Sequence, residues 1–289
     1  MSYVIITDAA ADLDADVAKQ AGIKILPMSY SLNKNMRVFS GNMLPEEYID
    51  FYYAQRHGDL TKTTQLAEEN FISAFKPYLK KGESILYISL SSGLSDTFDA
   101  ALSAKKKLLK EFPDCDIKVV DSLSATGGMG VFVERAIRNR EEGRSLEDNY
   151  NYLNMMSGHV HIWFYVQDLN YLKRGGRISG VTAFFGTVLN VKPVLRVDHQ
   201  GKLVNYKNAR GSGSARDIIF ELFKEHYDGG DDVIYIVDAD SRNEANDLAD
   251  LVSRFNPRGE IRRHTLSPII GAHTGPGMVA ICHAGKKSK

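Results

Sequence analysis

Short runs rich in β-branched residues recur along the first half of the chain. Residues 3–7, 84–90 and 116–122 are such runs, and each is typical of a buried strand. Residues 23–32 form a further run, which Pro27 interrupts because proline cannot donate a backbone hydrogen bond to a neighbouring strand. The pattern therefore predicts four strands, one of them divided.

Segments with helical periodicity separate these runs. Residues 12–22 and 67–81 predict two helices, a third apolar stripe begins at Phe98, and a fourth helix follows the "GGMG" cluster and continues through Arg140. Strands that alternate with helices predict a parallel sheet with helices on its faces. Residues 33–63 are polar and predict an irregular segment with one helical turn.

The second half of the chain has a different pattern. Its strand-like segments alternate with two helices, and Gly201 has the chemistry of a hairpin turn, so we predict a sheet of mixed direction with helices on one face. The strand-like residues are 159–169, 192–209 and 231–239, and the helices are near 213–227 and 242–255. Residues 181–191 are apolar around most of a helical circumference. A boundary near 151–158 predicts two α/β domains, 1–155 and 156–289, with a ligand cleft between them.

Composition and charge indicate a globular protein that does not bind nucleic acids. Of the residues, 43% are hydrophobic and 25% are charged, which is the profile of a soluble chain with a substantial core. Lys and Arg together number 36, as do Asp and Glu, so the formal net charge is zero. Nucleic-acid binding normally requires a basic surplus, and this class is therefore disfavoured.

The cysteines and the N-terminal residues indicate a cytoplasmic protein. Cys115 and Cys282 form no CxxC pair, and we interpret them as small buried side chains in a reducing compartment. The N-terminus lacks a basic start and reaches Asp8 too early for a secretion signal. No apolar run has the length that a bilayer requires.

The common catalytic and metal-binding motifs are absent from the sequence. It contains no GxSxG, GxxxxGK[ST], GxGxxG after a strand, or HExxH. His159 and His161 would share one face of a strand, as a metal pair does, but no acidic or cysteine partner lies nearby in the sequence. We therefore predict no metal site.

Two hydroxyl-rich turns are candidates for an anion site. Ser95 stands where the cap of the Phe98 helix belongs, and Ser92 and Gly93 precede it in "LSSGLS". A helix start carries free N–H groups and partial positive charge, which favour an anion, but serine caps are also common without any ligand. Thr63 and Thr64 in "KTTQ" form the second cluster. Because both clusters are expected at carboxyl ends of parallel strands, their side chains are expected to meet.

Two further loops could complete a pocket. "GAHTGPG" is a glycine-rich loop that carries His273, and it would bring the imidazole from the second domain. "YLKRGGRISG" is a basic loop whose Arg174 and Arg177 suit recognition of a phosphate or an acidic partner. Each also has a simpler interpretation, as a turn or as a solvated basic loop.

The ordered set of these motifs resembles the DegV family, the fatty-acid-binding proteins of bacteria. The matching stretches are "TDAAADL", "KTTQ", "LSSGLSDT", "DSLSATGGMG", "YLKRGGRIS", "LNVKP" and "HTGPG", which run in the family's order from residue 7 to residue 277. Each stretch is unspecific alone, but seven in order cover nearly the whole chain.

The resemblance implies a long-chain fatty acid, such as palmitate, stearate or oleate, buried between two α/β domains. It implies no catalytic residue and no cofactor besides this ligand, and it allows a transient membrane contact. Many members present the lipid carboxylate to a separate ATP-binding subunit of a fatty acid kinase, which serves phospholipid metabolism. The residues that match by position are Thr63 and Ser95 for the carboxylate, with Ser92, Thr64, Gly93 and His273 as neighbours, and Arg174 and Arg177 on the partner side.

Three positions depart from the family pattern, and one rival function remains open. Ala9 and Ala10 replace hydroxyl residues, and Asp96 replaces a glycine beside the proposed carboxylate site. A carboxylate at that position would repel an anionic ligand unless it points to solvent. The alternative is a Ser/His hydrolase of a lipid-like ester, with Ser95 or Ser92 as nucleophile and His273 as base.

Overall fold

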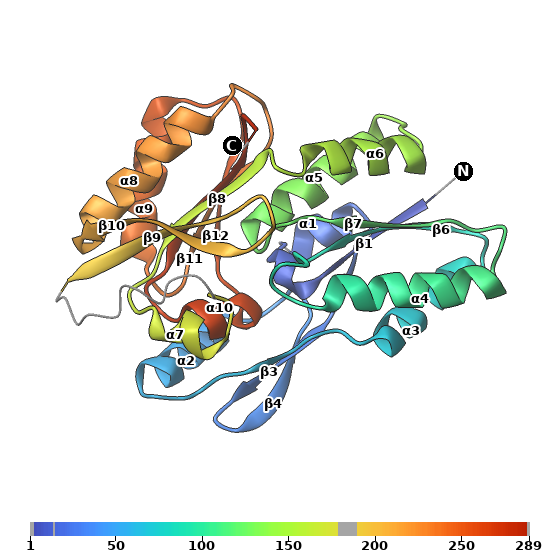
Figure 1. Cartoon of the computed structure of the whole chain (residues 1–289), viewed down its shortest axis with the longest axis horizontal. Coiled ribbons are helices and arrows are strands. Elements are labelled where there is room, and N and C mark those ends of the chain that lie inside the picture. The colour runs from blue at the N-terminus through green and yellow to red at the C-terminus, as the bar shows by residue number, and fades with distance from the viewer. Residues whose placement is uncertain (1–2, 14, 179–189, 288–289) are drawn as a thin grey trace.

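Two β-sheets organise the protein, and they lie toward opposite ends of its longest axis (Figure 1). The computed structural model describes residues 3–13, 15–178 and 190–287. A smaller third sheet and several short helices lie between and below the two main sheets in this view. The functional site depends on how these three parts meet.

The first sheet confirms the predicted parallel α/β arrangement. Its four strands are parallel throughout and follow the spatial order β2 (Lys24–Leu26), β1 (Tyr3–Asp8), β6 (Ser84–Ser89) and β7 (Ile117–Asp121). Helices cover both faces: α3 (Glu68–Leu79) and α4 (Thr97–Glu111) lie on one side, α5 (Gly127–Glu141) and α6 (Leu146–Met156) on the other. Every residue of β6 is buried for this reason, which explains its continuous apolar run.

The second sheet confirms the predicted mixed sheet. Its spatial order is β10 (Leu203–Arg210), β9 (Val191–Val197), β8 (Val160–Tyr165), β13 (Val279–Ala284), β11 (Ile234–Asp238) and β12 (Ile261–Thr265). All its described pairs are antiparallel except β11 with β12. Its own helices, α8 (Gly211–His226) and α9 (Arg242–Phe255), pack against it, and α5 from the first half contacts it as well.

Helix α5 joins the two sheets into one structure. It contacts β1 and β6 of the first sheet and β8, β11 and β13 of the second. A Cβ atom at Gly127 would lie 2.6 Å from the Cβ of Tyr235, so the glycine cluster lets the helix approach the second sheet closely. The predicted division at 155/156 falls at the end of α6 and stays a prediction.

The prediction of an irregular segment at 33–63 was wrong. This segment contains strand β4 (Asn35–Phe39), helix α2 (Pro45–Arg56) and part of the short strand β5 (Thr63–Thr64). Strands β4 and β5 flank β3 (Met28–Leu32) in an antiparallel sheet. Pro27 marks the point where the chain leaves the first sheet at β2 and enters this one at β3.

The helix predicted over residues 12–22 is shorter than expected. A 3-10 turn, η1 (Ala9–Ala11), precedes it, and α1 spans Ala15–Gln20. Between them Asp12 is left-handed, with φ of 48°. The buried carboxylate of Asp12 accepts hydrogen bonds from the Thr126 hydroxyl at 2.5 Å and from the Ser267 amide at 3.3 Å. These contacts hold Asp12 out of the helix.

Two short helices, α7 (Asn170–Arg174) and α10 (Pro268–Thr274), pack against each other beside β3. Most of the apolar segment 181–191 that the sequence singles out lies outside the described residues. Within the described ranges, no helix has both the length and the apolar character that spanning a membrane would need.

Candidate functional site

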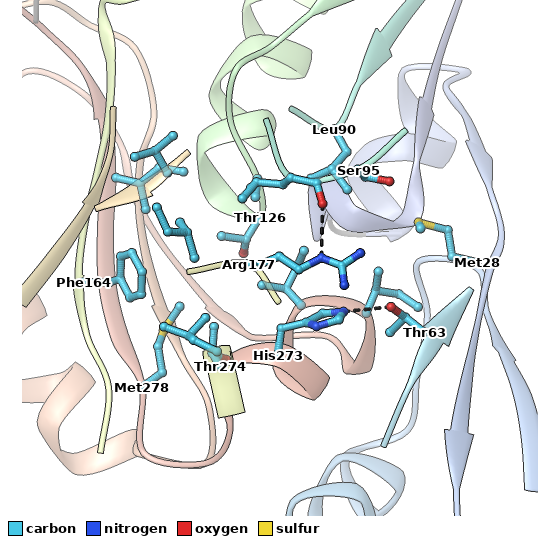
Figure 2. Close-up of a pocket in the computed structure, with 18 of the residues that line it drawn as sticks. Met28, Thr63, Leu90, Ser95, Thr126, Phe164, Arg177, His273, Thr274 and Met278 are labelled. Atoms are coloured by element: carbon cyan, nitrogen blue, oxygen red, sulfur yellow. Dashed lines mark hydrogen bonds between the residues drawn. The ribbon is translucent and has the colours of Figure 1, made fainter. Parts of the chain in front are cut away.

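A cavity of about 350 Å³ lies where elements of both halves meet (Figure 2). It is within the range of small-molecule pockets. Twelve of its lining residues are apolar and come from both halves of the chain: Met28, Leu90, Leu94, Ala125, Ile162, Phe164, Leu172, Val197, Leu203, Ile269, Ile270 and Met278. Such a wall favours an apolar ligand, since it offers no partner to polar atoms.

Polar side chains gather on part of the cavity wall. They are Thr63, Thr64, Gln65, Ser95, Arg177 and His273, and the remaining two lining residues are Thr126 and Thr274. Figure 2 shows His273 pointing toward Thr63, and Phe164 and Met278 farther along the cavity. The cavity is therefore amphipathic, with one polar region and a longer apolar one.

Thr63 and His273 are in direct contact although 210 residues separate them in sequence. The Thr63 Oγ1 lies 2.8 Å from the His273 Nε2. Thr63 belongs to β5, which pairs with β3 at Tyr30, and not to the end of a parallel strand as predicted. His273 lies in the last turn of α10, where the sequence predicted a loop. The sequence predicted that Thr63 and Ser95 meet and that His273 comes close to them; Thr63 contacts His273, and Ser95 lines the same cavity.

His273 is neutral at physiological pH. Burial lowers the pKa of His273 to about 4, and the positive charge of Arg177 adds to this effect. A neutral imidazole presents one N–H donor and one acceptor nitrogen, so it can share a hydrogen bond with the Thr63 hydroxyl. His273 thus contributes polarity to the cavity without a fixed positive charge.

Ser95 lines the cavity, but it does not cap α4. Helix α4 begins at Thr97, and its cap position is Asp96, whose side chain makes no capping hydrogen bond. The prediction was therefore displaced by one residue. The Ser95 Oγ accepts a hydrogen bond from the Thr97 amide at 3.3 Å and lies 2.9 Å from the Thr97 hydroxyl. Asp96 is exposed and does not line the cavity.

The rest of the serine turn holds the two halves of the chain together. The Ser91 hydroxyl donates a 2.8 Å hydrogen bond to the Gly201 carbonyl in the β9–β10 turn. A Cβ at Gly93 would lie 2.5 Å from the Gln200 carbonyl oxygen, so only glycine permits this approach. Ser92 and Gly93 border a shallow surface hollow with Lys202 and do not line the cavity. Ser91 and Gly93 thus mainly hold this turn against the backbone of the β9–β10 turn.

The two arginines of the basic loop lie in different places. Arg177 lines the cavity and donates through Nε to the Leu94 carbonyl at 3.2 Å (Figure 2). Arg174 is exposed, stacks over the Tyr171 ring at 4.4 Å, and lines a neighbouring hollow with Lys62. Thr63, Arg177 and His273 border both spaces, so this hollow adjoins the polar region of the cavity.

The positions that depart from the family pattern lie away from the cavity. Ala9 and Ala10 are buried in η1, and the Ala10 carbonyl accepts a hydrogen bond from the Thr126 amide at 2.8 Å. The neighbouring Asp8 carboxylate accepts hydrogen bonds from the Tyr87 hydroxyl at 2.7 Å and from the Leu90 amide at 3.1 Å. Burial raises the pKa of Asp8. These groups hold the walls of the cavity in place.

His159, in the turn before β8, and His161, in β8, both contact backbone carbonyls of the C-terminal segment. The His159 Nδ1 lies 3.1 Å from the Gly285 carbonyl oxygen, and the His161 Nε2 lies 2.7 Å from that of Lys286. No group of three His, Cys, Asp or Glu among the described residues has the arrangement of a metal site. Cys115 and Cys282 are both free thiols, and Cys282 is fully buried in β13.

Sequence reasoning missed three polar groups of the cavity. Gln65 stands in the "KTTQ" motif, and Thr126 precedes the glycine cluster, so both lie beside recognised signals. Thr274 follows His273 directly. Arg177 was expected only on the partner side, whereas its exposed side chain also borders the cavity.

The fold and the site together define a class: an α/β protein of two main sheets with an amphipathic cavity at their junction. A family model described as "Uncharacterised protein, DegV family" matches residues 2–286. A DegV domain-containing protein of Clostridium perfringens is 33% identical over 286 residues, which cover 98% of this chain and 97% of that protein. The chain belongs to the DegV family.

Solved structures share the fold over the whole chain. A fatty-acid-binding DegV family protein from Thermus thermophilus is 29% identical, with a TM-score of 0.87 over 99% of this chain and 100% of its own. DegV of Bacillus subtilis, described as a fatty acid binding protein, is 26% identical, with a TM-score of 0.86 over 99% and 100% of the two chains.

Proposed function

We propose that this protein binds one long-chain fatty acid, with the tail in the apolar part of the cavity and the carboxylate at its polar region. The observation that carries the proposal is the amphipathic wall, in which Thr63, Ser95, Arg177 and His273 border a space whose lining is mostly apolar. The fatty-acid binding described for relatives of 26–29% identity supports it.

The energetics of a long acyl chain fit an enclosed cavity. Burial of about fifteen methylenes at about 0.8 kcal/mol each gives a gross driving force of about 12 kcal/mol. A shallow surface site would leave half of this area in water. The apolar wall draws on β8, β9, β10 and α10, and this supports a site that contacts the tail from several sides.

The carboxylate would be held by hydroxyls and by one cation. Thr63 and Ser95 supply O–H donors, and the Arg177 guanidinium supplies positive charge without losing its proton. The exposed side chain of Asp96 does not face the cavity, so its charge would be screened by solvent. Palmitate, stearate and oleate are the ligands that we would test first.

We propose further that the bound carboxylate is presented to an ATP-binding kinase subunit. In that step a carboxylate oxygen attacks the γ-phosphorus of ATP, an acyl phosphate forms and ADP leaves. The basic groups Lys62 and Arg174, in the hollow that adjoins the polar region, support a role in docking such a partner. On this proposal the protein is itself no enzyme and works in the cytoplasm, where ATP is available.

The hydrolase alternative has less support. The Ser95 hydroxyl contacts Thr97, and the histidine contacts Thr63 and neither Ser92 nor Ser95. Among the described residues the His273 ring hydrogen-bonds to Thr63 and to no carboxylate, so it lacks the acidic partner that orients the histidine of a catalytic triad.

A competition titration tests the proposed ligand class. A fluorescent fatty acid bound to the purified, delipidated protein should be displaced by stearate, while methyl stearate, which has the same tail and no carboxylate, should bind at least about tenfold more weakly. Ser253→Ala, which removes an exposed hydroxyl on α9, serves as a control and should give the same displacement as the parent protein. Equal displacement by acid and ester would show that the polar region does not read the carboxylate.

A further inference from the structure

Helix α10 supplies part of the cavity wall, yet much of its packing is against the first half of the chain. It lies between β12 and β13 in sequence, and its residues Ile269, Ile270, His273 and Thr274 line the cavity. Its main packing partners among the described helices and strands are α7, β3 and η1, and the last two belong to the first half. The position of His273 therefore depends on contacts between the halves.

Two buried side chains of the first half bind the backbone where α10 begins. The Asp12 carboxylate accepts a hydrogen bond from the Ser267 amide at 3.3 Å, and the Tyr52 hydroxyl donates to the Leu266 carbonyl at 2.7 Å. The exposed fractions of Asp12 and Tyr52 are only 2% and 0%. Because a buried polar group that loses its partner is destabilised, both bonds resist displacement of the helix start.

A third contact continues along α10. The side-chain amide of Gln55, in α2, donates to the Gly271 carbonyl at 3.2 Å, and Gln55 is 1% exposed. A Cβ at Gly271 would lie 2.5 Å from the Tyr52 hydroxyl oxygen, so the glycine lets α10 pack closely on α2. His273 follows two residues later, and the anchored backbone therefore leads directly to the imidazole.

Asp12 also reaches a second wall of the cavity. Its carboxylate accepts a hydrogen bond from the Thr126 hydroxyl at 2.5 Å. Thr126 stands at the start of α5 and lines the cavity. One buried side chain thus joins the end of η1 to the starts of both α5 and α10.

Backbone strain marks the same junction. Asp12 and Thr126 have φ of 48° and 46°, in the left-handed region that non-glycine residues seldom adopt. Aspartate tolerates this region, but for a β-branched threonine it is an outlier. Such conformations persist only where surrounding contacts determine them, and they cluster at ligand sites. The hydrogen bond between the two side chains is one such contact.

We propose that Asp12 and Tyr52 are positioning residues for recognition of the fatty-acid carboxylate, because they fix α10 so that His273 meets Thr63. Neither residue lines the acyl cavity, so each acts through α10 and not by contact with the ligand. This role accounts for Asp12 in the "TDAAADL" motif, which has no other part in the proposed site. The proposal rests on the proposed function, since it takes the polar region to bind a carboxylate.

Competition titrations with stearate and methyl stearate test the role, because displacement of His273 affects the acid more than the ester. Asp12→Ala should reduce the preference for the acid at least about fivefold, and Tyr52→Phe, which removes only a hydroxyl, at least about threefold. Asp12→Asn keeps an acceptor and tolerates the left-handed backbone, so its preference should stay within about twofold of the parent.

Asp238→Ala is the control for stability. It removes another buried carboxylate, which accepts a 2.8 Å hydrogen bond from the Ser241 amide and does not line the acyl cavity. Its urea midpoint should fall, while its preference for the acid should equal that of the parent. A loss of stability alone at Asp12 would give the same result, so the comparison separates positioning from stability.

An NMR titration of His273 gives a second measurement that needs no fatty acid. Burial lowers the pKa of His273 to about 4 in the parent. If α10 shifts in Asp12→Ala or Tyr52→Phe, water reaches the ring, and the pKa of His273 should rise by at least about one pH unit. The exposed His199 is the reference, and its signals should be the same in all the proteins.

The outcomes separate this proposal from the proposed function. If Asp12→Ala does not fold, Tyr52→Phe carries both measurements. Folded variants that prefer the acid as the parent does, and that leave the titration of His273 unchanged, would overturn the proposal. A parent protein that binds no stearate would contradict the proposed function instead, and the titration of His273 would still decide whether Asp12 and Tyr52 position α10.

Discussion

Removal of the Thr63 hydroxyl tests the carboxylate site at one atom. Thr63→Val keeps the shape of the side chain but deletes Oγ1, which lies 2.8 Å from the His273 Nε2 on the cavity wall. A carboxylate that loses one buried donor is destabilised by about 1–3 kcal/mol, so we expect fatty-acid affinity to fall about 5- to 150-fold. Thr63 is only half-buried in a two-residue strand, and we therefore expect the folded state to persist.

The matched variant Thr63→Ser separates the hydroxyl from the methyl group. It keeps a donor at this position, and its affinity should stay within about threefold of the parent, since only one methyl contact is lost. Both affinities are measured by displacement of a fluorescent fatty acid, with circular dichroism as the check on folding. If Thr63→Val binds stearate as tightly as the parent, or if Thr63→Ser is as weak as Thr63→Val, the placement of the carboxylate is wrong.

Three further expectations concern charge, pH and backbone packing. Arg177→Glu should weaken fatty-acid binding at least tenfold, which a competition assay measures. Arg174→Glu should leave fatty-acid binding unchanged but slow phosphorylation of the bound acid by the kinase subunit, which a phosphoryl-transfer assay measures. Burial lowers the pKa of His161 and of His273 to about 4. Between pH 6.5 and about 4 these two histidines bind protons in the unfolded chain but not in the folded chain, so they lower stability as the pH falls. The urea midpoint of His161→Gln should therefore fall less than that of the parent over this window. Gly93→Ala should destabilise the protein by about 1–3 kcal/mol, because the new Cβ would lie 2.5 Å from the Gln200 carbonyl oxygen. Gly213→Ala is the control and should not destabilise it, because a Cβ there meets no atom within 4 Å. Urea denaturation of both variants measures the difference.

The two main sheets were predictable because their signals are local. Buried strands such as β6 and β11 appear as uninterrupted apolar runs, and the stripes of α3 and α8 repeat with helical spacing. The pairing of β9 with β10 follows from the turn at Gly201, whose φ is 72°. Each of these elements carries its own pattern whatever it packs against.

Helix α2 and strand β4 were missed because their patterns are weak. The polar and aromatic residues of α2 form no clear stripe, although Pro45 at its start and the acidic residues after it are helix-start signals. Glu47 also accepts a hydrogen bond from the Leu44 amide at 2.9 Å. Strand β4 is exposed along most of its length, so burial gives it no alternation.

The membership of the cavity was predictable only in part, and its geometry was not. Thr63, Ser95 and His273 all line it, as the motif pattern implied. The contact between Thr63 and His273 joins a strand of the small sheet to the end of α10, and a hydrogen bond from Arg177 to the Leu94 carbonyl holds this exposed side chain at the border of the cavity. Such long-range contacts leave no periodic signal in the sequence.

Fatty-acid binding is tested most directly by native mass spectrometry of the gently purified protein, followed by extraction and identification of any ligand. We expect one long-chain fatty acid per chain in the native spectrum, lost on denaturation, since water against the apolar part of the cavity wall is unfavourable. The delipidated protein should regain one equivalent of added stearate or oleate. A spectrum of unliganded chain alone, together with no uptake of either acid, would contradict the proposed function.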